Sequence, residues 1–178
     1  MRAIPLALLA LTLGACNAAY RLPEGATQTA KVRFSSPDAR LGNSLGVYSL
    51  SSEDSCMDAK KLRHLGGWQM GGISEKDLDI GMLKVPGVDY GKNQYVEVPV
   101  VAEQRANFAL QGLSGGQTCH LTLSFLPKAD RQYEVNFFTS GPKCYGGVYE
   151  LVPASGTVRL ERETSAKLNG KTCTTFWN

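Results

Sequence analysis

The stretch TCHLTLSFL, residues 118–126, alternates between apolar and polar side chains. In an extended chain one face would carry Cys119, Leu121, Leu123 and Phe125. The opposite face would carry His120, Thr122 and Ser124. A period of two is typical of a β-strand that packs one face into a core and leaves the other in water. The stretch therefore predicts a half-buried strand, and with it a β-sheet domain.

Similar signals recur on both sides of this stretch, separated by turn-forming residues. We predict strands over residues 29–35, 45–50, 79–84, 94–102, 107–111, 118–126, 132–139, 145–152 and 157–162. Pro99 cannot donate to a ladder, which places the strand over 94–102 at a sheet edge or a bulge. Short strands at such spacing are typical of sandwiches. The predicted fold is all-β: a two-layer antiparallel β-sandwich, immunoglobulin-like or transthyretin-like and disulfide-bridged, over residues 29–178.

Two segments between the predicted strands differ in character. Asp54 to Leu65 is the only stretch for which we predict a helix. HLGGWQMGG, residues 64–72, predicts a loop, because its glycines weaken any regular element. An aromatic side chain on a loop can present a contact, which makes Trp68, Gln69 and Met70 a candidate binding loop. The alternative, which is favoured because tryptophan is mostly buried, is that Trp68 plugs one end of the sandwich.

The chain begins with a charged residue, a short apolar run and small residues. Arg2 precedes the run from Ala3 to Leu13, which is much shorter than the roughly 20 apolar residues that a membrane-spanning helix needs. This order is typical of an export signal that is removed. Leu13-Gly14-Ala15-Cys16 resembles the lipobox of bacterial lipoproteins. There the cysteine thiol accepts a diacylglycerol, the peptidase cuts before the lipidated cysteine, and the freed amine is usually acylated as well.

The lipobox resemblance implies how the protein is placed in the cell. It implies a signal peptide over residues 1–15, a lipid anchor at Cys16 and a lipidated tether over residues 16–28. Asn17 stands where an aspartate retains many Gram-negative lipoproteins at the inner membrane. The resemblance therefore implies the outer membrane, with the domain in the periplasm. A cysteine buried in an N-terminal core helix is the alternative.

Four further cysteines remain: Cys56, Cys119, Cys144 and Cys173. An even number in an exported chain predicts two disulfides, because the periplasm is oxidising. A metal site would favour close pairs such as C-x-x-C, and the chain contains none. Three connectivities are possible. We favour Cys119 with Cys144, since both open strands at the same end of a three-strand meander, which leaves Cys56 with Cys173.

The body of the chain carries a second resemblance. CHLTLSFLPKADRQYEVNFFTSGPKC, residues 119–144, and Asp79-Ile80-Gly81-Met82 are similar to small uncharacterised lipoproteins of pseudomonad-type bacteria. The resemblance implies a sandwich fold and an envelope location, and it brings no activity with it.

Evidence for catalysis is thin. Gly42 to Gly46 matches the G-x-S-x-G elbow of hydrolases around Ser44, but that elbow needs a strand before it and a helix after it. His64 and His120 have no acidic or nucleophilic neighbour in sequence, and we expect His120 to be exposed and solvated. Asp77 and Asp79 are expected to face water. We predict no catalytic residue, and the chain has no phosphate, dinucleotide, zinc or calcium motif that would imply a cofactor or metal.

Charge and composition narrow the choice of partners. The 19 lysines and arginines nearly balance the 16 aspartates and glutamates, without long runs, so no nucleic-acid footprint appears. Phe176 and Trp177 near the C-terminus are expected to dock on the core. We expect a non-catalytic, membrane-anchored binding or adapter module for an envelope protein or peptidoglycan. The alternatives are an inhibitor of a lytic envelope enzyme and an envelope hydrolase using Ser44.

Overall fold

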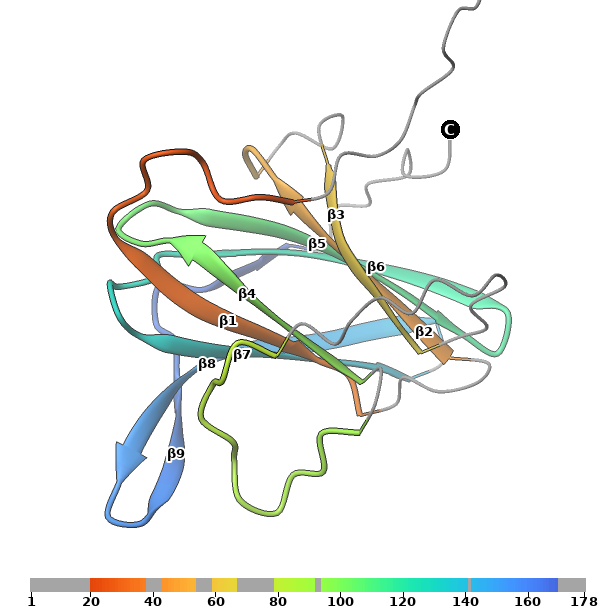
Figure 1. Cartoon of the computed structure of the whole chain (residues 1–178). Coiled ribbons are helices and arrows are strands. Elements are labelled where there is room, and N and C mark those ends of the chain that lie inside the picture. The colour runs from red at the N-terminus through yellow and green to blue at the C-terminus, as the bar shows by residue number, and fades with distance from the viewer. Residues whose placement is uncertain are drawn as a thin grey trace, which may run out of the picture.

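The computed structural model describes residues 20–37, 43–53, 59–66, 79–91, 94–140 and 142–169. Within these ranges the chain forms ten β-strands and no helix, so no described segment is a helix that could cross a membrane. The strands form two five-stranded sheets that pack face to face (Figure 1). The predicted all-β, two-layer sandwich is confirmed.

Each sheet draws its strands from distant parts of the chain. Sheet A has, in order, β4 (Tyr95–Val101), β1 (Thr29–Ser35), β7 (Gln132–Ser140), β8 (Lys143–Ala154) and β9 (Thr157–Arg162). Sheet B has, in order, β10 (Lys167–Asn169), β6 (Gln117–Phe125), β5 (Ala106–Ser114), β2 (Asn43–Leu50) and β3 (Lys60–Gly66). All the described neighbours pair antiparallel except β1 and β7, which run parallel. As Pro99 predicts, β4 is an edge strand.

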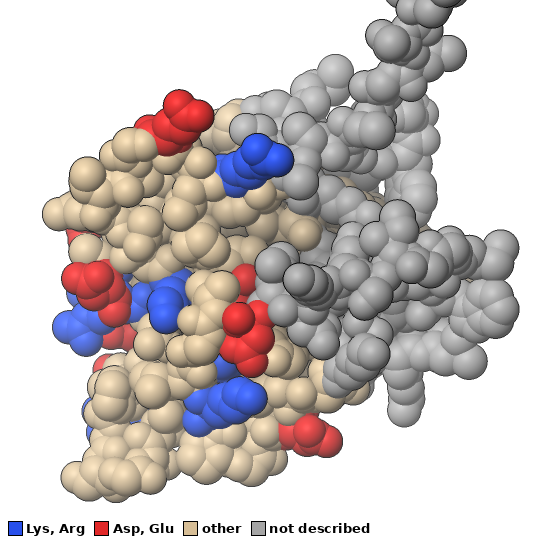
Figure 2. All heavy atoms as spheres, in the orientation of Figure 1, with Lys and Arg blue, Asp and Glu red and all other residues tan. Residues whose placement is uncertain are grey.

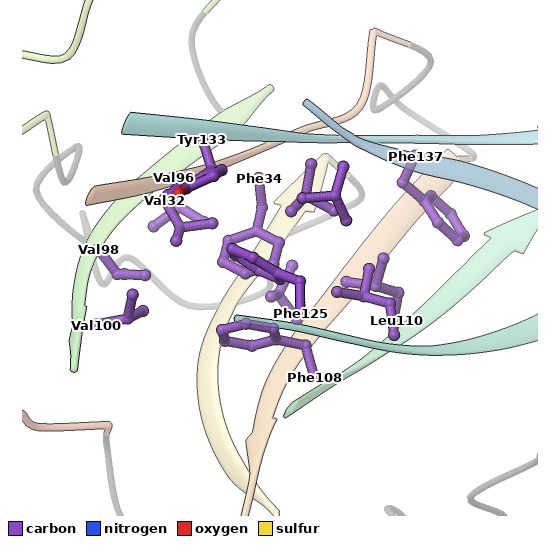
Figure 3. Packing of buried hydrophobic residues seen from close by; sticks show 14 of the residues in the cluster. Val32, Phe34, Val96, Val98, Val100, Phe108, Leu110, Phe125, Tyr133 and Phe137 are labelled. Carbon is purple, nitrogen blue, oxygen red and sulfur yellow. The ribbon is translucent and has the colours of Figure 1, made fainter. Parts of the chain in front are cut away.

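The core lies between the inner faces of the two sheets (Figure 3). Its centre is aromatic: the Phe34 and Phe108 ring centroids lie 4.8 Å apart, and those of Phe125 and Tyr133 lie 5.1 Å apart. The apolar face predicted for residues 118–126 is buried in this core. Period-two alternation therefore identified the inner face of β6 correctly.

A disulfide joins Cys119 in β6 to Cys144 in β8, with Cα atoms 5.7 Å apart. It therefore ties sheet B to sheet A, and it confirms this pairing. Cys56 and Cys173 lie outside the described residues, so their pairing stays a prediction.

Two predicted elements are wrong. The helix expected over Asp54 to Leu65 is contradicted by β3, whose backbone pairs antiparallel with β2. Pairing with a neighbouring strand overrides the weak propensity of a short segment. Residues 79–84 form no strand, because their amides donate to side chains instead of a ladder: Ile80 and Met82 to Glu97, and Leu83 to Gln132. β10 was not predicted either.

Candidate functional site

Three charged side chains form a row across the outer face of sheet A. Arg33 in β1 lies directly opposite Glu97 in β4 and opposite Glu134 in β7. The three residues are 0%, 1% and 2% exposed. Charged side chains are almost never this buried unless they are paired. We call this row the triad.

Hydrogen bonds hold the Arg33 guanidinium at all three of its nitrogens. Its Nε and Nη2 donate to Glu97 Oε1 at 2.9 and 2.7 Å, and its Nη1 donates to Glu134 Oε2 at 3.1 Å. Burial by itself would lower the pKa of Arg33, but the bond to Glu97 and the charge of Glu134 raise it overall. The triad combines two carboxylates with one guanidinium and so has an excess of one negative charge.

Residues 79–91, which we call the strap, cross the outer face of sheet A and cover the triad; in Figure 1 they are the long green loop that leads toward β4. The Ile80 and Met82 amides donate to Glu97 Oε2 at 2.8 and 3.2 Å. In return, Lys31 Nζ donates to the Ile80 carbonyl at 3.1 Å. The strap thus supplies partners for a carboxylate that would otherwise be buried without enough of them.

Tyr90 fastens the other end of the strap. Its ring lies 4.3 Å from the Arg33 guanidinium carbon, and its hydroxyl donates to Glu134 Oε2 at 2.8 Å. Burial, together with the bond to Glu134 and its charge, raises the pKa of Tyr90 to about 12. The hydroxyl therefore stays a donor at any physiological pH.

A groove of about 820 Å³ runs between the strap and strands β7 to β9 on this outer face. Val88 and Asp89 of the strap line one wall, and Leu160 of β9 lines another. Phe138 in β7 and Tyr145 in β8 are opposite each other in register and stack with ring centroids 5.2 Å apart. These two side chains are 44% and 43% exposed, so the groove presents an aromatic surface to its contents.

Glycine shapes the floor of the groove. Gly147 in β8 lies opposite Asn136 in β7. A Cβ at Gly147 would lie only 2.7 to 2.9 Å from the ring of Tyr149, which also lines the groove. The absence of a side chain therefore lets the Tyr149 ring lie over the neighbouring backbone.

Polar groups meet at the inner end of the groove. Ser35 Oγ lies 2.9 Å from Glu134 Oε1 and 2.7 Å from the terminal oxygen of Asn136. One hydroxyl hydrogen serves one acceptor at a time, so the Ser35 hydroxyl is shared between these two oxygens. The polar groups at this end of the groove are therefore already paired with one another.

Most of the predicted site residues lie outside the described part of the chain. These are the lipidation site Cys16, the candidate loop residues Trp68, Gln69 and Met70, the cysteines Cys56 and Cys173, Asp77, and the C-terminal Phe176 and Trp177. Asp79 is described: it is exposed and accepts hydrogen bonds from the Gly81 amide and the Tyr95 hydroxyl, which lower its pKa.

Ser44 lies inside β2, between β3 and β5, so the strand-to-helix turn of a nucleophile elbow is missing. His120 lies two strands away in β6, which places the two backbones roughly 10 Å apart. His64 in β3 lies opposite Gly46 in β2. The side chain of His64 is not among those that the structure describes.

The expectation that His120 is exposed and solvated is wrong. The residue does lie on the outer face of sheet B, but it is half-buried, and its Nδ1 has no hydrogen-bond partner among the described residues. Burial lowers the pKa of its imidazole. The outer face of this sheet is partly covered, so alternation predicted the direction of the side chain and not its exposure.

The residues that build the groove and the triad were not predicted from the sequence. Arg33, Glu97 and Glu134 each occupy a polar position in an alternating strand, where a charge is usually solvated. A signal was present, because all three lie on the outer face of predicted strands. Only the strand order brings them together.

In the comparison with known proteins, no family profile and no curated protein matches the chain. Within the described ranges, no group of three or more His, Cys, Asp or Glu side chains is placed to hold a metal ion.

We predict that Ser44 is not a nucleophile. A fluorophosphonate probe should leave the purified protein unlabelled, because Ser44 lies in a strand paired on both sides and not on the strand-to-helix turn that exposes a nucleophile. A known serine hydrolase serves as the positive control. Labelling that disappears in Ser44→Ala would overturn this prediction.

Proposed function

We propose that the protein is a lipid-anchored, non-catalytic binding module of the bacterial outer membrane, and that it binds an envelope protein or peptidoglycan in the groove on sheet A. The observation that carries the proposal is the groove itself. An exposed aromatic pair lines it, and a buried triad under the strap holds its wall in place. Concave sites with aromatic walls and a few fixed polar groups are typical of binding sites.

The N-terminal segment supports an anchored arrangement. Tyr20 packs against the core and donates its hydroxyl to the Pro99 carbonyl at 3.0 Å, and the Ala102 amide donates to the Gln28 carbonyl at 3.0 Å. Cys16 is four residues before Tyr20, so a lipid there would hold the sandwich within roughly 15 Å of the membrane. In Figure 1 this segment crosses the top of the sandwich, and the β8–β9 hairpin projects from the opposite end. The groove wall in β9 would then face away from the membrane.

Lipidation at Cys16 is testable directly. Metabolic labelling with a fatty acid should mark the wild type and leave Cys16→Ser unmarked, because the thiol is the group that accepts the lipid. Cys56→Ser is the matched control and should remain labelled. Equal labelling of wild type and Cys16→Ser would contradict the anchor.

The binding role can be tested in intact cells with a photocrosslinking amino acid. At Val88, which is 47% exposed on the groove wall, it should give a discrete adduct. At Leu168, which is 38% exposed in β10 of the other sheet, it should give none. The Val88 adduct should weaken when Tyr145→Ala is added. An adduct equally strong at both positions, or none at Val88, would contradict a groove-binding function.

A further inference from the structure

We propose that the groove takes a basic segment of a protein partner, with a lysine or arginine head beside the carboxylates and its aliphatic stem against the aromatic rings. This inference rests on the proposed binding function and narrows it to one ligand chemistry.

The first argument is charge. Asp89 and Glu134 line the groove, and among its described lining residues there is no lysine, arginine or histidine. Arg33 lies behind the wall, where both carboxylates of the triad engage it and the Tyr90 ring covers it. Figure 2 shows acidic and basic side chains scattered over this face, so neither sign forms a broad patch there. The negative character is therefore local to the groove and the triad.

The second argument is hydrogen-bonding capacity. The Tyr90 hydroxyl is committed to Glu134, and the Ser35 hydroxyl is shared between Glu134 and Asn136. Both carboxylate oxygens of Glu134 already accept hydrogen bonds, so the acceptor that remains for a ligand is the exposed Asp89 carboxylate on the strap wall. Ammonium and guanidinium groups only donate, so they match this wall of the groove.

The third argument is the aromatic wall. A cation over an aromatic face is attracted by the ring, and the aliphatic stem of lysine or arginine covers apolar surface. Phe138 and Tyr145 offer such a wall while being 44% and 43% exposed. Exposed aromatic side chains of this kind are enriched in protein–protein contacts. A neutral glycan could stack on the same rings but would gain nothing from the excess negative charge.

The test uses the full chain purified in a neutral detergent and three probes measured by calorimetry. The probes are a short acetylated peptide with two arginines, the same peptide with citrulline in place of arginine, and a soluble N-acetylglucosamine oligosaccharide. Citrulline keeps the shape of arginine and removes its charge. We expect the arginine peptide to bind at least about tenfold more tightly than either other probe.

Variants place the binding in the groove. Tyr145→Ala and Asp89→Asn should each lower the affinity for the arginine peptide by about fivefold or more. Tyr145→Phe should keep most of the affinity because it keeps the ring. The matched controls are Leu168→Ala, an exposed apolar residue of sheet B, and Glu24→Gln, an exposed acid in the N-terminal segment. Both should bind as the wild type does. Circular dichroism checks that each variant is folded.

The outcomes separate the inference from the function on which it rests. Citrulline and arginine peptides that bind equally, with both lost in Tyr145→Ala, would overturn the cation inference and leave a binding groove. If the oligosaccharide binds more tightly than the arginine peptide and this binding is lost in Tyr145→Ala, the cation inference would be overturned. The result would favour peptidoglycan as the ligand of the groove. Arginine-peptide binding that is unchanged by Tyr145→Ala and Asp89→Asn, or absent, would also overturn the inference. If, in addition, no adduct forms at Val88 in the crosslinking experiment, the proposed binding function is contradicted too.

Discussion

Replacing Arg33 by methionine should lower the free energy of unfolding by about 3–5 kcal/mol. The substitution removes the cation from the triad and leaves Glu97 and Glu134 buried without it, at 1% and 2% exposure. In a domain of this size, 1 kcal/mol corresponds to roughly 2–4 °C in the melting temperature, so thermal denaturation should show a drop of about 6–20 °C.

A surface ion pair provides the matched control. Arg131 contacts Glu150 at 3.3 Å, and the Arg131 side chain is 55% exposed. Arg131→Met should cost less than about 1 kcal/mol, because solvent screens such pairs. Combining Arg33→Met with Glu97→Gln and Glu134→Gln removes all three charges and keeps acceptor oxygens for the strap amides and Tyr90, so it should recover part of the stability lost in Arg33→Met. Equal melting temperatures for Arg33→Met and Arg131→Met would show that the buried triad has no special energetic role.

Removing the Cys119–Cys144 disulfide should have an effect of similar size. The bond joins β6 to β8 across the two sheets at a sequence separation of 25 residues. Closing a loop of that length constrains the unfolded chain by about 3–4 kcal/mol. The variant with both Cys119→Ala and Cys144→Ala should therefore unfold at lower urea concentration than the oxidised wild type.

Two comparisons isolate the contribution of this bond. Reduction of the variant with Cys56→Ala and Cys173→Ala opens this bond alone, replaces no further residue and should reproduce most of the loss. A variant with Cys56→Ala and Cys173→Ala reports on the second predicted bridge, and mass spectrometry of unreduced material should find no free thiol at any of the four cysteines. An oxidised wild type that is no more stable than the reduced one would mean that the bridges do not stabilise the fold.

Alternation was sufficient where a strand packs one face on the core, even where its neighbours in the sheet are distant in sequence, as they are for residues 29–35. Residues 29–35 and 157–162 are strands with the predicted bounds, and residues 118–126 differ from β6 by one residue at each end. The pairing of Cys119 with Cys144 is as predicted, but the reason for it was wrong: β6 lies in sheet B and β7 and β8 lie in sheet A, so the three strands form no meander and the bond joins the two sheets. Period-two burial is a property of the local chain, so a local pattern can reveal it.

The same reasoning failed where contacts outside a segment decide its structure. Residues 60–66 are a strand because the preceding strand, β2, lies beside them. Residues 79–84 leave the sheets because Glu97 and Gln132 accept their amide hydrogens across separations of 15 to 49 positions. Local propensity is too weak to outweigh such contacts.

The sequence by itself determined the class of the fold and the inner face of most strands, because these depend on alternation. Only the tertiary structure decided the site. Arg33 lies 64 positions from Glu97 and 101 from Glu134, and the antiparallel pairing of β1 with β4 together with the parallel pairing of β1 with β7 sets the three side by side. The strap then excludes water from the row, which turns three ordinary polar positions into a buried charged triad. Burial and the attraction of opposite charges depend on distances in space. These distances are set only when the sheets form, so the sequence pattern does not reveal them.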